Sequence, residues 1–181
     1  MLNSLSNPKT PHYNEFKKWV LGPDFYWTYN AQGGVKFPGG YSDRSVPFYT
    51  RAFIKRPEIS KYPVTVQDPH EVDSVVKVMT EILEHNNYDF NSILRLSVNC
   101  VHPEKVVTSS FPHVDHHFPH KNFIIYLTSS GGSTFVQGEE YSPKEDDAIV
   151  FSGEHYICLL YTSDAADERS SVDLDGRRII K

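Results

Sequence analysis

The chain has 181 residues, 39% of them hydrophobic, and a net charge of −5, which together suit one domain with a sizeable core. No apolar run reaches the ~18 residues of a membrane span, and no basic start precedes an apolar stretch, so we expect neither a span nor a secretory leader. The 18 Lys and Arg residues are fewer than the 23 Asp and Glu residues and form no basic block, which argues against nucleic-acid binding.

Cysteine and turn residues narrow the class further. The two cysteines, Cys100 and Cys158, cannot form a disulfide framework, so we expect a reducing, cytoplasmic location. Twelve prolines and ten glycines, among many Tyr, Phe, Val and Ile residues, favour short strands joined by turns.

The first third of the chain contains two predicted strands around a glycine-rich loop. Residues 25–29 and 48–54 are rich in aromatic and β-branched side chains, which is typical of strands. Residues 33–40 lack the Gly-Lys-Ser/Thr ending of a phosphate-binding loop and precede no helical pattern, so we interpret them as turns.

A helix is predicted to begin after Asp68. Asp68 is a good N-cap, Pro69 suits the first helical position, and Glu71 follows the cap by three residues. Asn86 and Asn87 can provide a left-handed exit. Between these ends, apolar residues recur at helical spacing and predict one face packed against a sheet: Val72, Val75, Val76, Met79, Ile82 and Leu83.

From residue 92 onward the pattern changes to the alternation of strands. Within residues 93–101, apolar side chains alternate with Arg95, Ser97 and Asn99, whose polar face either meets water or lines a cavity inside a barrel. Further strands are predicted at residues 122–128, 133–137, 147–151 and from 155 onward. Short strands at this spacing predict a sandwich, a jelly roll or a barrel.

A histidine-rich segment provides candidate metal ligands. His113 and Asp115 lie two residues apart, so on an extended segment both side chains point the same way. A second imidazole opposite them would complete a facial triad for non-haem Fe(II), with positions left open for substrate and O2. His155 is the expected third ligand, because it begins a strand that antiparallel pairing could bring beside His113.

Neighbouring histidines offer an alternative. His116, His117 and His120 compete for the metal role, because two histidines three residues apart can hold zinc. No cysteine accompanies them, so we interpret these three residues as a surface loop.

Three motifs in a fixed order resemble a known family. They are Phe-Pro-His113-Val-Asp115, a Tyr126-Leu strand followed by Gly131-Gly132-Ser-Thr134, and a Pro143-Lys turn that leads through a Phe151 strand to His155. This set resembles the 2-oxoglutarate- and Fe(II)-dependent oxygenases, and is closest to the prolyl-4-hydroxylase-like group with its short bacterial and phage members. The resemblance covers roughly residues 92–157.

The resemblance implies a fold and a set of ligands. The fold is a double-stranded β-helix, a jelly roll that holds the metal inside one end, here with one or two packing helices. The implied cofactor is Fe(II), held by His113, Asp115 and His155, and the implied cosubstrates are 2-oxoglutarate and O2. By position, Tyr126 resembles the tyrosine that binds the far carboxylate of 2-oxoglutarate, and Asn99 falls near another contact; Tyr126 as a plain core residue remains the alternative.

The resemblance also implies a reaction. The family hydroxylates a C–H bond of a peptidyl or small-molecule substrate and releases succinate and CO2. Two alternatives stay open: a cupin-like metalloenzyme that does not use 2-oxoglutarate, and a non-catalytic jelly-roll binding protein. No nucleic acid or membrane partner is expected.

The chain departs from the family pattern after His155. The family has a basic residue about ten positions after the last histidine, where an arginine fork can hold a carboxylate. Here the next basic residue is Arg169, in a polar stretch, and Arg177 and Arg178 begin a strand-like run at too great a distance.

The C-terminal segment has an unusual resemblance of its own. Residues 158–168, CLLYTSDAADE, are similar to one reading frame of a transposon-based sequencing adapter. We therefore expect a single oxygenase-like domain at residues 1–157 and a non-native tail at residues 158–181, which would replace a strand with the carboxylate-binding arginine and leave this exact chain inactive.

Overall fold

The computed structural model describes residues 1–30, 48–56, 68–101, 108–110, 112–129, 132–161 and 171–175. Two helices lie in this part of the chain: α1 at Pro11–Val20 and α2 at Pro69–His85. The strands are β1 at Asn3–Leu5, β2 at Thr28–Asn30, β3 at Phe48–Ile54, β4 at Leu96–Val101, β5 at Thr108–Ser109, β6 at Lys121–Tyr126, β7 at Thr134–Val136, β8 at Glu139–Tyr141, β9 at Ala148–Ser152, β10 at Ile157–Tyr161 and β11 at Ser171–Asp175.

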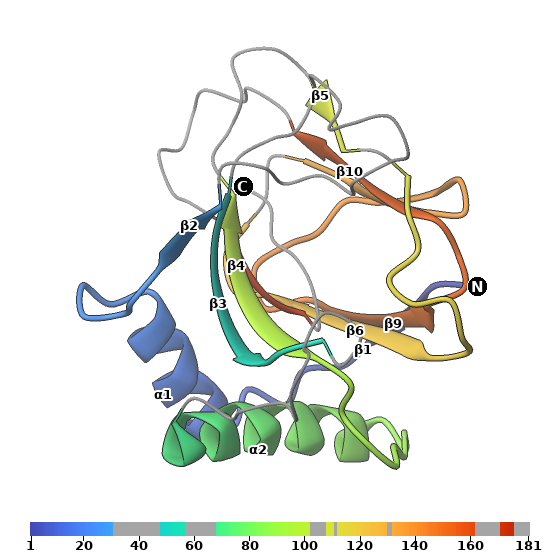
Figure 1. Ribbon diagram of the computed structural model, residues 1–181. Helices are drawn as coiled ribbons and strands as arrows, with labels where there is room; N and C mark the ends of the chain where they lie inside the picture. Colours follow the sequence, from blue (N-terminus) through green and yellow to red (C-terminus); the bar gives the residue numbers. More distant parts are fainter. Residues whose placement is uncertain are drawn as a thin grey trace.

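The strands form two antiparallel sheets that face each other (Figure 1). The larger has the order β1-β9-β6-β11-β4-β3-β2, and the smaller has the order β5-β10-β7-β8. From β4 to β11 the chain passes repeatedly between the sheets: β4, β6, β9 and β11 lie in the larger one, and β5, β7, β8 and β10 in the smaller one. This mainly β arrangement with two helices is consistent with the predicted jelly roll.

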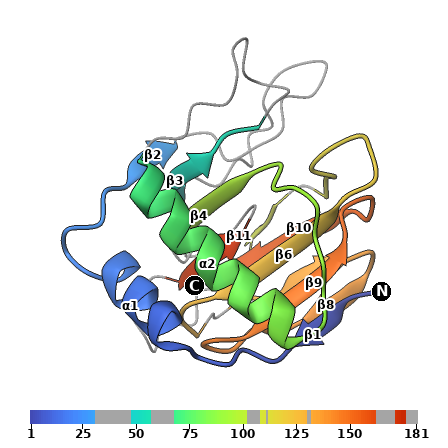
Figure 2. The same cartoon turned by 90° about the horizontal axis from the view of Figure 1, so that it is seen from below.

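Both helices cover the outer face of the larger sheet (Figure 2). The predicted helix is confirmed: Asp68 caps α2 by accepting a hydrogen bond from the His70 N–H, and Asn87 has a positive φ of 57° after its end. Val78 belongs to the buried stripe, whereas Val76 is only partly buried. The core beneath the helices includes Phe53, Val75 and Val98.

Helix α1 was not predicted, and polar contacts hold it to the sheet. The Thr10 side chain caps it, and the Tyr13 hydroxyl donates to Asp146 Oδ1 at 2.6 Å. Lys17 and Lys9 also pair with the Asp146 carboxylate. Burial raises the pKa of Tyr13, and the hydrogen bond to Asp146 raises it further. Burial would raise the pKa of Asp146, but the hydrogen bonds from Lys17, Lys9 and Tyr13 outweigh it and hold that pKa below its usual value.

The polar face of β4 is buried, as a cavity-lining face would be. Ser97 is 0% exposed and Asn99 is 1% exposed, although both carry polar side chains. A second cluster of buried residues lies on this inner side of the sheet and includes Ile124, Tyr126 and Phe151. The strand therefore separates the helix-covered core from the space between the sheets.

Some predicted elements differ from the observed ones. The strand predicted at residues 25–29 is wrong for its first half, because the Phe25 ring packs at 4.6 Å from Trp27 and 4.8 Å from Trp19 and only Thr28–Asn30 pair with β3. The strand predicted at residues 48–54 is confirmed as β3. The glycine-rich loop at residues 33–40 lies outside the described residues.

Candidate metal centre

His113 and Asp115 lie close together beside the start of β10. His113 forms an antiparallel bridge with Ile157, in which the His113 N–H donates to Ile157 O at 3.1 Å and the Ile157 N–H donates back at 2.9 Å. His113 is 6% exposed and Asp115 is 8% exposed. His113 Nε2 lies 3.7 Å from Asp115 Oδ1. Two metal–ligand bonds of roughly 2.1 Å each could span this separation, so the pair fits two adjacent positions of one metal ion.

The third predicted ligand lies in a turn just before β10. The His155 N–H donates to the Ser152 oxygen at 3.2 Å, two residues before Ile157, the bridge partner of His113. His155 Nδ1 is buried and has no hydrogen-bond partner in the described part of the chain. Nevertheless, the described residues contain no group of three His, Cys, Asp or Glu side chains close enough to hold a metal. The structure thus brings His113 and Asp115 together and does not bring the His155 side chain into the same cluster.

Sequence reasoning missed Arg56, which lies directly against Asp115. Its guanidinium donates from Nη1 to the Asp115 backbone oxygen at 3.3 Å, and Nη2 lies 3.7 Å from Asp115 Oδ1. The Asp115 side chain is 4% exposed, so this cation compensates a largely buried charge. No motif surrounds Arg56, and only the pairing of β3 with β4 brings it to this end of the sheet.

The predicted cosubstrate residues line the space between the sheets. The Tyr126 hydroxyl shares a hydrogen bond of 2.8 Å with Thr134 Oγ1, and both residues are buried. Asn99 Oδ1 accepts a hydrogen bond from Thr50 Oγ1 at 2.7 Å. Thr50 and Thr134 are therefore further polar groups of this interior, which the sequence did not single out beyond the Gly-Gly-Ser-Thr motif.

The neighbouring histidines do not form one surface loop. His117 is exposed, as predicted, but His116 is 6% exposed, so the prediction is wrong for this residue. The His116 ring stacks on Phe118 at 4.9 Å and meets the His120 ring edge-on at 4.8 Å. Packing against Phe118 explains the burial of His116, and the alternative zinc site has no three-ligand group among the described residues.

Strand β11 occupies the place between β4 and β6. Its register sets Asp173 opposite Asn99 on one side and opposite Tyr126 on the other. The strand contains two aspartates and no basic residue. Arg169, Arg177 and Arg178 lie outside the described residues, so the basic group that a carboxylate would need is not supplied by the described part of the tail.

Comparison with known proteins identifies the fold. Neither a protein-family model nor a curated protein matches the sequence. Among solved structures, a 2OG-Fe(II) oxygenase family oxidoreductase from Burkholderia pseudomallei matches with a TM-score of 0.55 at 15% identity, over 86% of this chain and 74% of that one. A prolyl hydroxylase from Trichoplax adhaerens, in complex with a hypoxia inducible factor oxygen degradation domain peptide fragment, matches with a TM-score of 0.58 at 12% identity, over 96% of this chain and 82% of that one.

In the part of the chain that the structure describes, no helix is long and apolar enough to cross a membrane.

The predicted superfamily resemblance is confirmed at the level of fold: the chain folds like the 2OG-Fe(II) oxygenases and prolyl hydroxylases that it matches.

Proposed function

We propose that the protein is an Fe(II)- and 2-oxoglutarate-dependent dioxygenase that hydroxylates a C–H bond of a small-molecule or peptidyl substrate and releases succinate and CO2. The observation that carries the proposal is the buried His113–Asp115 pair, 3.7 Å apart, at one end of the two facing sheets. The alternation of β4 to β11 between these sheets supports a double-stranded β-helix.

The donor set suits iron. One imidazole and one carboxylate are already adjacent, and His155 offers a buried ring nitrogen without a hydrogen-bond partner in the described part of the chain. His113, Asp115 and His155 would hold Fe(II), and a metal bound by two histidines and one carboxylate supplies O2 activation for C–H hydroxylation. Cys100 and Cys158 are not joined by a disulfide, which supports a reducing compartment such as the cytoplasm.

The remaining residues have separate roles in this proposal. Arg56 holds the Asp115 carboxylate in place and compensates its charge. Asn99 and Tyr126 bind 2-oxoglutarate in the buried interior, where Thr50 and Thr134 orient them. Packing between the two sheets keeps this interior away from bulk water.

A second function has one observation in its favour. Strand β11 places Asp173, an acidic residue, at the register position opposite Asn99 and Tyr126. The described residues of this strand include no basic residue, which favours a metalloenzyme of the same fold that does not use 2-oxoglutarate.

Succinate release tests the proposal. The protein is incubated aerobically with Fe(II), ascorbate and 2-oxoglutarate, and succinate is quantified against His117→Ala and Asp115→Ala variants. If the tail at residues 158–181 still allows 2-oxoglutarate to bind, we expect succinate from the wild type and from His117→Ala, whose side chain is exposed, and none from Asp115→Ala. Metal binding without succinate would favour the second function, and equal succinate from Asp115→Ala would exclude the proposed ligand set.

A further inference from the structure

A cavity of about 380 Å³ lies on the helix-covered side of the larger sheet and reaches Asp115. It is bordered by α2, by residues 88–96 and by residues 115–123, with Val150 of β9 at its base. Its volume falls within the range of small-molecule sites, ~300–1,000 Å³. The residues proposed to hold 2-oxoglutarate, Asn99 and Tyr126, do not line it, so it is a separate space.

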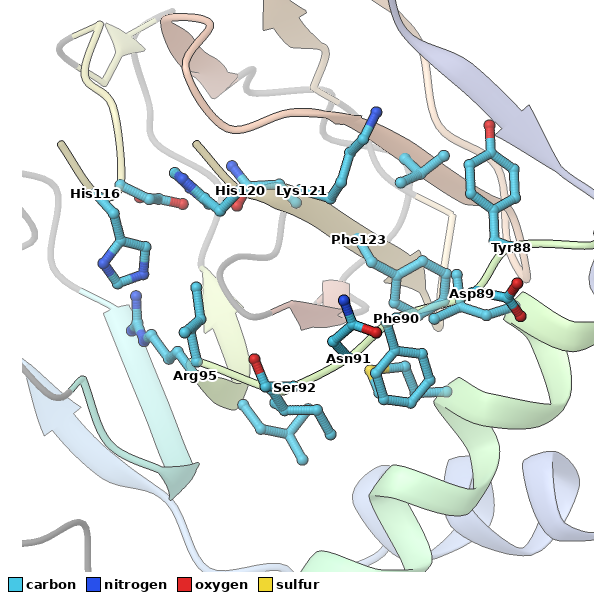
Figure 3. A pocket seen from close by; sticks show the side chains of 18 of the residues that line it. Tyr88, Asp89, Phe90, Asn91, Ser92, Arg95, His116, His120, Lys121 and Phe123 are labelled. Atoms are coloured by element: carbon cyan, nitrogen blue, oxygen red, sulfur yellow. The ribbon is translucent and has the colours of Figure 1, made fainter. Parts of the chain in front are cut away.

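One end of the cavity is apolar. Met79 and Leu83 from α2, Phe90 from the following loop and Phe123 from β6 line it. Figure 3 shows Phe90, Phe123 and Tyr88 together near the helix, with Asp89 at the outer edge of the same group. This end suits an aliphatic chain or an aromatic group.

The opposite end carries positive and titratable groups. Arg95, Lys121, His116 and His120 line it together with Asp115. Figure 3 shows Arg95 and His116 at the end that lies away from Phe90. Arg95 and Lys121 bring fixed positive charges to this end, and the Arg56 guanidinium lies against the Asp115 carboxylate. An arginine fork matches the geometry of a carboxylate.

We propose that this cavity binds a small amphiphilic monocarboxylate, with its carboxylate at Arg95 and its apolar body between α2 and Phe123. Asp115 belongs to both the cavity and the proposed metal centre, so the bound molecule is the substrate class of the proposed oxygenase; this part rests on the proposed function.

Binding of decanoate by the metal-free protein tests the inference without any turnover. Isothermal titration calorimetry at submicellar concentration compares decanoate with decanol and decylamine. We expect saturable binding of decanoate at one site, and binding of decanol and decylamine weaker by at least tenfold. Arg95→Gln should weaken decanoate binding by at least tenfold and abolish the preference over decanol, because only the charge contact is removed.

Two further variants separate the possible outcomes. Met79→Phe narrows the apolar end and should weaken decanoate and decanol binding alike, whereas Lys18→Gln, an exposed charge change on α1, should leave both unchanged. Circular dichroism checks that each variant is folded. Failure of decanoate to bind, or equal binding by wild type and Arg95→Gln, would overturn the inference.

The same titration distinguishes the inference from the proposed function. Asp115→Ala removes a proposed metal ligand but leaves Arg95 and the apolar end, so decanoate binding should persist in that variant. Loss of succinate release with decanoate binding intact would count against the oxygenase alone. Succinate release without decanoate binding would count against the cavity alone.

Discussion

Gly153 shows how closely the chain packs beside the candidate metal centre. A Cβ atom at this position would lie 2.0 Å from His120 Nε2, and the Gly153 N–H donates to the His120 backbone oxygen at 2.9 Å. His120 Nδ1 in turn contacts the Phe118 oxygen at 2.8 Å, which fixes the ring. A side chain at position 153 would therefore have to displace the His120 ring.

Gly153→Ala is predicted to lower the free energy of unfolding by about 1–3 kcal/mol, because the added methyl group displaces the His120 ring. Urea denaturation measures the effect. Adding His120→Ala to the same chain should recover most of the loss, since the clash is with that ring. Equal destabilisation in the single and double variants would show that the steric contact is not the cause.

At the scale of single residues, the sequence was sufficient to predict a pair of residues that lie close together in the chain. The two-residue spacing of His113 and Asp115 was sufficient to predict that their side chains share a side, and the structure sets them 3.7 Å apart. Arg56 and the burial of His116 were not predictable, because each depends on a partner brought in by strand pairing or by ring packing. The metal role of all three ligands stays a prediction.

At the scale of the elements, capping residues and an apolar stripe determined which helix could be predicted from the sequence. The caps and apolar stripe of α2 predicted it almost to the residue. Helix α1 has only Thr10 and Pro11 as start signals and no acidic residue in its first turn, and its anchor, Asp146, is remote in sequence. The short strands β1, β5 and β8 were missed because two or three residues carry no periodicity.

The anchor of α1 predicts a pH dependence. Asp146 has a lowered pKa in the folded chain, so its contribution to stability is fully present above its unfolded value, about 3.9, and is lost as the pH falls through the lower folded value. Asp146→Asn should lower the free energy of unfolding by about 1–2 kcal/mol at pH 7, because the charged hydrogen bonds are lost. Asn tolerates the positive φ of 70° at this position.

Denaturation midpoints between pH 7 and pH 2 check this prediction. The difference between wild type and Asp146→Asn should shrink as the pH falls below about 4. Glu145→Gln is the matched control, since Glu145 also pairs with Lys17 but is 55% exposed and should change stability little. A difference that is constant over the whole pH range would rule out this role of the Asp146 charge.

The position of strand β11 leads to a prediction about 2-oxoglutarate binding. Asp173 stands in register opposite Asn99 and Tyr126, the two proposed cosubstrate residues. Asp173→Arg should strengthen 2-oxoglutarate binding to the Mn(II)-loaded protein by about tenfold, because the substitution supplies a cation that can hydrogen-bond a carboxylate. Calorimetry measures the affinity.

The control for that experiment is Asp175→Arg, which makes the same charge change opposite Ser97. An equal gain in 2-oxoglutarate affinity in both variants would indicate a general effect of net charge. No gain in Asp173→Arg would show that this position of β11 does not affect 2-oxoglutarate binding. The prediction that residues 158–181 are a non-native tail is compatible with an acidic strand at this place, and it stays a prediction.

At the scale of the whole molecule, the larger sheet divides the buried residues into two groups, one on each of its faces. The helix-covered side of the larger sheet holds the main core, and the inner side holds buried polar groups such as Asn99 and Tyr126. His113 and Ile157 join the two segments that carry the proposed ligands. Alternating patterns predicted the strands, whereas the order of strands in each sheet became visible only in the structure.

Anaerobic Fe(II) titration of the wild type and of four single variants measures whether His113, Asp115 and His155 hold iron. We predict one Fe(II) per wild-type chain, binding weaker by at least tenfold in His113→Ala, Asp115→Ala and His155→Ala, and no change in His117→Ala. A wild-type chain that binds no iron, or three ligand variants that bind it as tightly as the wild type, would contradict the account.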